Sequence, residues 1–339
     1  MRNGTTSLAL ALAFGMMLAG GREARGAEAT PPRPTATAAV KATTPASGAV
    51  AAVNEAHAAA LRGLDWFVAN ADGMELDFAV KNAEKFRRVT ADDGVRRRMD
   101  ALIRRRLAEV PKAAAALEAQ DRKGSGWFSI RKPVQDLLLM KAAGLPWKAD
   151  AERLAQLFAQ KGEALLPPRT MPSQRLIAAR QLSQLGLPTG EIYRETVAAI
   201  RAEPPASRLV EGKRGVMSLS ARTHVVFTMS DYYARTLAPA DFAYEIDAFA
   251  RALEELAGRE QLDDVTADIA SEVLTARKVL RLPPDARTNA VQKYLLAMQN
   301  ADGSWGGEEQ SNAKVHHTAM AILALMEFGA EFQVGMDVL

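Results

Sequence analysis

Residues 294–305 read Tyr-Leu-Leu-Ala-Met-Gln-Asn-Ala-Asp-Gly-Ser-Trp. An aromatic residue followed by Leu opens the stretch, Gln299 comes five residues after Tyr294, and Asp-Gly-Ser-Trp follows. A generic helix end does not have this composition. An amide and an indole both need hydrogen-bond partners when they are buried. The stretch is therefore the best guide to the fold.

The stretch resembles the QW motif of squalene cyclases and protein prenyltransferases. In those families the Gln caps a helix and stacks on the Trp of the next turn, and the corner recurs once per helical hairpin. Residues 315–325 resemble the inner helix that follows such a corner, including the His-Thr pair that zinc-dependent prenyltransferase β subunits carry there. The resemblance implies contact between Gln299 and Trp305. It also implies an all-α fold, an (α/α)6 toroid of about six helical hairpins.

Breaks in the helical pattern support such a repeat. From Asn54 onward the apolar spacing is helical, and no convincing alternating strand is present. Gly or Pro follows the last turn of several apolar helices, at intervals of roughly 40 to 50 residues or about twice that, which is a solenoid or toroid period. An open superhelix of helix pairs is the alternative to a closed ring. We expect outer helices at 54–70, 94–120, 147–161, 189–202, 240–257 and 285–299, and inner helices at 75–89, 130–143, 173–186, 222–237, 264–280 and 314–328.

The N-terminal region does not belong to this pattern. Residues 8–21 form an apolar run too short to span a bilayer, and a small-x-small site follows at 27–29. This pattern predicts a cleaved signal peptide, with an uncleaved N-terminal anchor as the alternative. After cleavage the mature protein would be exported, periplasmic or secreted, and would have no membrane span. We expect a signal peptide at 1–29, a disordered Pro/Thr/Ala-rich leader at 30–53, the toroid domain at 54–332 and a C-terminal tail at 333–339.

Composition limits the classes of function. The chain has 339 residues, of which 48% are hydrophobic and 6% aromatic, which suits closely packed helices rather than a β-sandwich. The formal net charge of +3 does not indicate a nucleic-acid partner, because that needs a concentrated basic surface. The chain has no cysteine, which excludes disulfides and thiol chemistry.

The candidate site follows from where the inner helices begin. In the toroids that this chain resembles, inner helices point their N-terminal ends into one funnel, which implies that their first turns converge. Those turns hold His224 and His317, and a column of carboxylates at Asp264, Asp268 and Glu272. Carboxylates spaced i, i+4 and i+8 share one helix face, and they repel one another unless a cation or a proton relieves the repulsion.

A divalent metal is one interpretation of these five residues. They offer the mixed nitrogen and oxygen ligands that zinc or another divalent metal accepts, and His317 matches the zinc histidine of the resembled prenyltransferases. The cysteine ligand of that family would align near Thr266, and its absence here puts thiolate activation in doubt. A metal-free polar pocket and plain helix packing are the alternatives.

Three functions stay open from the sequence. The first is an exported enzyme in which His224, Glu272 and His317 bind a metal or act as acid and base on a small-molecule or peptide ligand in the funnel. The second is a non-catalytic binding module of the same fold. The third is a carbohydrate-active toroid, which needs facing carboxylates and an aromatic floor. The oligomeric state is left open.

Overall fold

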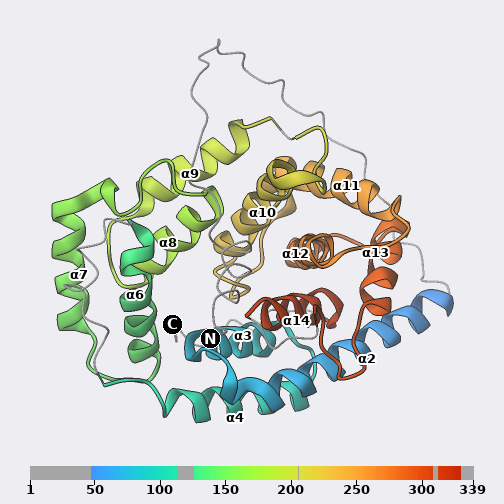
Figure 1. The fold of residues 1–339 in the computed structure, drawn as a ribbon, viewed down its shortest axis with the longest axis horizontal. Coiled ribbons are helices and arrows are strands. Elements are labelled where there is room, and N and C mark those ends of the chain that lie inside the picture. Colours follow the sequence, from blue (N-terminus) through green and yellow to red (C-terminus); the bar gives the residue numbers. More distant parts are fainter. Residues whose placement is uncertain (1–46, 113–125, 205, 308–311, 330–339) are drawn as a thin grey trace, which may run out of the picture.

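The computed structural model describes residues 47–112, 126–204, 206–307 and 312–329. These residues form twelve α-helices and three short 3₁₀ segments (Figure 1). The described part of the chain contains no strand, and Thr90 and Phe328 make an isolated antiparallel bridge. The expected all-α fold class is confirmed.

The helices alternate along the chain between the periphery and the interior of Figure 1. The peripheral helices are α2 (Ser47–Asn70), α4 (Asp93–Leu107), α7 (Lys148–Lys161), α9 (Gly190–Ala202), α11 (Ala243–Ala257) and α13 (Ala286–Ala297). The interior helices are α3 (Leu76–Val89), α6 (Trp127–Ala142), α8 (Pro172–Gln184), α10 (Gly212–Met229), α12 (Asp264–Val279) and α14 (Asn312–Leu325). The 3₁₀ segments are η1 (Ala71–Gly73), η2 (Gly162–Ala164) and η3 (Pro239–Phe242).

Successive interior helices pack against one another. α6 contacts α3 and α8, α8 contacts α10, α10 contacts α12, and α12 contacts α14. The largest hydrophobic cluster joins fully buried residues of α2, α3, α10, α12 and α14, among them Phe67, Phe86, Val226, Val273 and Ile322. Burial of this apolar surface is the main force that holds the helix pairs together.

The last helix pair packs against the first. Gln299 Oε1 accepts hydrogen bonds from Nε and Nη2 of Arg62 in α2, and Gln299 Nε2 donates to the carbonyl of Ala59. A Cβ on Gly63 would lie 2.7 Å from the ring of Trp305. Only glycine therefore allows α2 to approach the indole this closely.

A short segment after α14 makes a second contact with the beginning of the chain. The amide of Gly329 donates to the carbonyl of Val89 at the end of α3, at 2.8 Å. Lys278 of α12 donates to the carbonyl of Met326 at 2.8 Å, and its ammonium lies 5.2 Å from the centre of the Phe328 ring. The segment therefore ties α12, α14 and α3 together.

The corner between α13 and α14 is tightly bonded. Trp305 is buried, its indole Nε1 donates to the carbonyl of Leu295 at 2.7 Å, and its backbone amide donates to Thr318 Oγ1 at 3.0 Å. Gln299 Nε2 also donates to the carbonyl of Gly303 at 2.9 Å, across the turn. No hydrogen bond joins Gln299 to Trp305 in the described part of the chain, so direct stacking of the amide on the indole stays a prediction.

Two of the outer helices have boundaries that differ from those expected. α2 begins at Ser47 rather than at 54, inside the stretch expected to be a disordered leader. Its first residues are rich in Ala, the strongest helix former. α4 ends at Leu107 rather than at 120, because Pro111 follows and proline disfavours a helical conformation in the residue before it.

The inner helix α10 shows the largest difference. It was expected at 222–237, and it covers Gly212–Met229. Glycines at 212 and 215 gave its beginning the composition of a loop. Its end is set by residues 231–233, whose φ angles are all positive. His224 therefore lies beyond the middle of an inner helix, not in its first turn.

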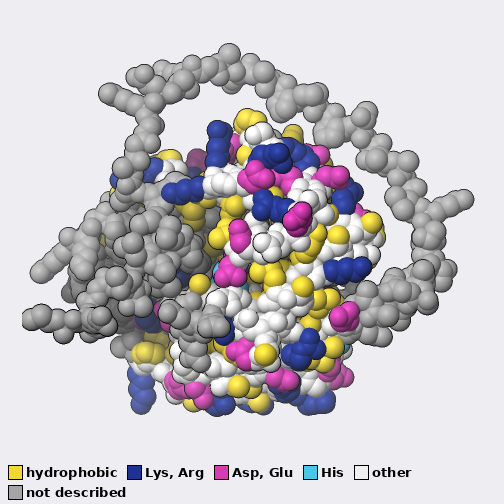
Figure 2. Space-filling model, turned by 45° about the vertical axis from the view of Figure 1, so that its right-hand side comes forward, with side chains coloured by type: hydrophobic (Ala, Val, Ile, Leu, Met, Phe, Trp, Pro, Cys, Tyr) yellow, Lys and Arg dark blue, Asp and Glu magenta, His cyan; other side chains and the backbone are white. Residues whose placement is uncertain are grey.

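Several expectations fall outside the described residues. They are the signal peptide at 1–29, the leader up to residue 46 and the tail at 333–339. Within the described ranges, no helix combines the length and the apolar character needed to cross a membrane. Figure 2 shows basic and acidic side chains interspersed over the face that it presents.

Candidate functional site

Three neighbouring interior helices supply the polar residues of the candidate site. α10 carries His224, α12 carries Asp268 and Glu272, and α14 carries His316. α12 packs against both α10 and α14. Asp268 therefore has His316 of α14 beside it, and Glu272 has His224 of α10 beside it.

A capping box fixes the start of α12. Asp263 Oδ1 accepts a hydrogen bond from the amide of Thr266 at 2.8 Å, and Thr266 Oγ1 accepts one from the amide of Asp263 at 2.9 Å. These reciprocal bonds satisfy two amides that the helix itself leaves without partners. The cap sets the positions from which Asp268 and Glu272 project, about one and two turns later.

Asp268, Glu272 and His316 form a group with metal-ligand spacing. One ligand atom from each of the three lies within 4.8 Å of the other two. His316 Nε2 is 3.3 Å from Asp268 Oδ1. That carboxylate oxygen is buried, and its contact with His316 is longer than a typical charged hydrogen bond. The group therefore has the ligand types that a cation would coordinate.

Glu272 is the most buried member of the group, at 5% exposed. Thr223 Oγ1 of α10 donates a hydrogen bond to Glu272 Oε2 at 2.5 Å, which fixes the carboxyl group. Burial, followed by the negative charge of Asp268, raises the pKa of Glu272 to about 7. Near neutral pH this group therefore exchanges a proton, or needs a cation to ionise fully.

Asp268 and His316 shift the pKa of each other. Burial alone would raise the pKa of Asp268, but the charge of His316 opposes it and the pKa is lowered. Burial would lower the pKa of His316, but the Asp268 carboxylate and then Glu272 oppose it and the pKa is raised. Around pH 6 the two side chains are therefore an ionised carboxylate and an imidazolium.

His224 stands beside the group without belonging to it. Its Nδ1 donates to the carbonyl of Ser220 at 2.8 Å and is 3.9 Å from Glu272 Oε2. Burial lowers the pKa of His224 to about 4, so the ring is neutral at physiological pH. With Nδ1 bonded to the backbone, Nε2 is the nitrogen left to accept a hydrogen bond or to bind a ligand.

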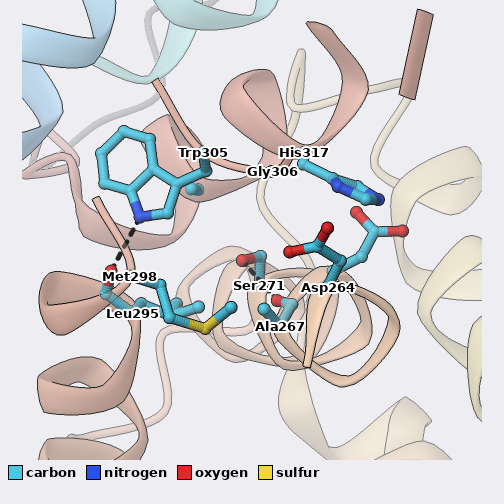
Figure 3. A pocket seen from close by; sticks show the side chains of 10 residues that line it. Asp264, Ala267, Ser271, Leu295, Met298, Trp305, Gly306 and His317 are labelled. Atoms are coloured by element: carbon cyan, nitrogen blue, oxygen red, sulfur yellow. Dashed lines mark hydrogen bonds between the residues drawn. The ribbon is translucent and has the colours of Figure 1, made fainter. Parts of the chain in front are cut away.

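His317 and Asp264 line a small cavity that adjoins the group. Asp268 and Ser271 of α12 and Trp305 of the corner also line it, and the ring of His317 is directed toward its Asp264 side (Figure 3). Burial lowers the pKa of His317. The three-residue ligand group of the described chain includes neither His317 nor Asp264.

The expected residue of α14 was His317. The ligand group contains its neighbour His316, while His317 lines the adjacent cavity together with Asp264 and Asp268. Both histidines were visible in the sequence, but consecutive helical residues point about 100° apart, since a turn holds 3.6 residues. His224 Nδ1 lies 3.9 Å from Glu272 Oε2, and Asp268 and Glu272 share the ligand group. That these residues form one site stays a prediction.

Comparison of the chain with protein-family models, with curated proteins and with solved structures finds no match in any of the three.

Proposed function

We propose that the protein is a divalent-metal-dependent enzyme whose cation, zinc or a similar ion, is held by Asp268, Glu272 and His316. One observation carries the proposal: three ligand atoms from two helices lie within 4.8 Å of one another. The buried Asp268 Oδ1 supports it, because its contact with His316 Nε2 at 3.3 Å is longer than a typical charged hydrogen bond. Two carboxylates and one imidazole suit zinc and other divalent transition metals.

The surrounding residues have distinct roles in this proposal. When bound, a cation would polarise a substrate carbonyl or lower the pKa of a bound water. Thr223 holds Glu272 in place, and the neutral His224 offers Nε2 to a ligand beside the group. Of the residues expected to be catalytic, Glu272 is then a cation ligand, while His317 lines the neighbouring cavity.

The fold in which this site lies is proposed to be an (α/α)6 toroid. The alternation of outer and inner helices, the packing of successive inner helices and the bonds from Gln299 to α2 support a closed ring. In this arrangement the ligand is a small molecule or a peptide inside the ring. We propose an exported enzyme, periplasmic or secreted, on the N-terminal sequence pattern.

Metal binding by variants of the two adjacent histidines tests the proposal. The full chain, purified without a polyhistidine tag, is freed of metal with a chelator and titrated with Zn²⁺ and Co²⁺ by calorimetry and absorption spectroscopy. We expect one tight equivalent, and binding at least about tenfold weaker in His316→Ala, the effect expected for loss of a ligand.

His317→Ala is the matched control, because it removes the same chemical group from the next position of the same helix. It should bind the metal about as tightly as the unchanged protein. Equal losses in the two variants, or no stoichiometric binding by the unchanged protein, would contradict the assignment of the ligands.

A further inference from the structure

The small cavity beside the ligand group has an apolar end and a polar end. Leu295, Met298 and Trp305 line one side of it, and Asp264 and His317 line the other (Figure 3). Leu295 and Trp305 are buried, whereas Asp264 is exposed. The polar end therefore faces solvent, and the apolar end lies inside the protein.

The apolar end presents carbon atoms to the cavity. The indole Nε1 of Trp305 donates to the carbonyl of Leu295 at 2.7 Å, and Ser271 Oγ donates to the carbonyl of Ala267 at 2.8 Å. These polar atoms have partners within the protein and need none from a ligand. The centre of a water-sized molecule has about 10 Å³ of space in the cavity, which is room for one methyl-sized group. The apolar end therefore suits the tip of a short hydrocarbon chain.

The polar end carries negative charge without a basic side chain to balance it. Asp264 and Asp268 line the cavity, and none of the described residues that line it is Lys or Arg. Within the described ranges Asp268 pairs with His316, whereas Asp264 has no ion-pair partner. Burial lowers the pKa of His317, so its ring is neutral at physiological pH and does not repel a cation.

A glycine allows His317 to lie at this end of the cavity. Gly306 also lines the cavity and has a φ angle of 91°, which residues other than glycine rarely adopt. A Cβ at this position would lie 2.9 Å from His317 Nδ1. Any other residue would therefore displace the imidazole.

We propose that the cavity binds a small primary alkylammonium ion, with its hydrocarbon tail against Trp305 and its ammonium group beside Asp264. A short tail and a positive head match the two ends of the cavity. The inference rests on the proposed function for the role of this ligand, because Asp268 belongs both to the cavity and to the ligand group. Binding of the amine itself needs no metal, so it can be measured without one.

Methyl NMR of the metal-free full chain tests the inference. The protein is labelled with ¹³C-methyl methionine and kept at neutral pH with a chelator and constant ionic strength, and Met298→Leu assigns the Met298 resonance. Propylammonium chloride is titrated, with 1-propanol as the uncharged molecule of the same shape. We expect a saturable shift of the Met298 resonance, and binding of the amine about fivefold tighter than that of the alcohol.

Three variants separate charge from shape. Asp264→Asn should weaken propylammonium about fivefold and leave 1-propanol unchanged, whereas Glu260→Gln, at another exposed carboxylate, should change neither. Ala321→Leu, at a buried wall residue of the cavity, should abolish binding of both molecules; circular dichroism confirms that each variant is folded.

The outcomes distinguish this inference from the proposed metal site. An unchanged Met298 resonance, or propylammonium binding by Asp264→Asn as tight as by the unchanged protein, would overturn the amine site. A saturable Met298 shift that depends on Asp264, together with no stoichiometric metal binding, would support the amine site and contradict only the proposed metal.

Discussion

The corner at 299–318 and the ligand group on α12 and α14 are both polar and both adjoin α14. They differ in how completely their polar atoms are hydrogen-bonded. In the corner, Asp302 Oδ1 accepts from the amide and the hydroxyl of Ser304, and Asp302 Oδ2 pairs with Lys314 at 3.2 Å. Asn300 Nδ2 donates to Ser304 Oγ and to the carbonyl of Gly306. These atoms of the corner all have partners.

The ligand group lacks this internal balance. Asp268 Oδ1 contacts His316 Nε2 at 3.3 Å without a well-formed hydrogen bond, and the pKa of Glu272 is raised while that of Asp268 is lowered. Neighbouring titratable groups whose pKa values are driven apart are typical of sites that bind or react. The comparison indicates that the corner stabilises the fold, whereas the carboxylates of the group repel one another, which a cation would relieve under the proposed function.

Replacing Trp305 by Ala should have the largest effect on the stability side of this comparison. The indole is 2% exposed and packs beneath α2. Its loss leaves a cavity and should lower the free energy of unfolding by about 3 to 5 kcal/mol, measured by urea denaturation. Tyr244→Ala, at a ring that is 45% exposed, is the control and should change little. A loss below about 1 kcal/mol for Trp305→Ala would contradict the claim that the corner stabilises the fold.

Glu272→Gln should raise the free energy of unfolding at neutral pH, whereas Trp305→Ala lowers it. The measurement is made in a buffer that contains a chelator. Because the fold raises the pKa of Glu272 from its ordinary value of 4.5 to about 7, the protonated form contributes stability that is complete below about pH 4.5. That contribution is lost as the pH rises through 7. Gln stays uncharged, so the variant should gain on the order of 1–3 kcal/mol relative to the unchanged protein between pH 5 and pH 8.

Thermal and urea unfolding at the two pH values measure this difference. Glu260→Gln, at an exposed position before α12, controls for the change of net charge. If the difference between Glu272→Gln and the unchanged protein were the same at pH 5 and pH 8, the fold would not raise the pKa of Glu272 as described.

Gln299→Ala should have the smallest effect of the three. The side chain bonds Arg62, Ala59 and Gly303, but the bonds to Arg62 are exposed and water replaces them in part. We expect a loss of about 1 to 2 kcal/mol in the free energy of unfolding. In Gln299→Glu the acceptor to Arg62 is kept and the donor to Ala59 and Gly303 is lost, so this variant shows which half of the amide matters. If neither variant lowered the free energy of unfolding, the Gln299 side chain would not stabilise the corner, and Trp305 alone would do so.

Sequence reasoning predicted the helices better than the site, for physical reasons. Gly and Pro end helices through their own backbone properties. The Gly- and Pro-containing segments at 144–146, 186–188 and 283–284 therefore predicted where α6, α8 and α12 end without knowledge of the packing. The end of α10 could not be found in this way, because tertiary contacts impose its left-handed residues. Glycines inside the first turn of the same helix hid its beginning.

The site was predicted only as far as periodicity allows. Spacing by four placed Asp268 and Glu272 on one face of α12. The choice between His316 and His317 depends on how α14 is rotated against α12, and that rotation is set by packing rather than by local sequence.

The bonds from Gln299 to α2 have a consequence for how the chain folds. Arg62 and Gln299 are separated by 237 positions, so this contact is among the most non-local in the molecule. At a synthesis rate of about 5 to 20 residues per second, Gln299 is made roughly 10 to 50 seconds after Arg62. Until then the apolar side of α2 that receives Trp305 has no partner. Nascent chains of this protein therefore pass through a period in which that surface is open to chaperones and to aggregation.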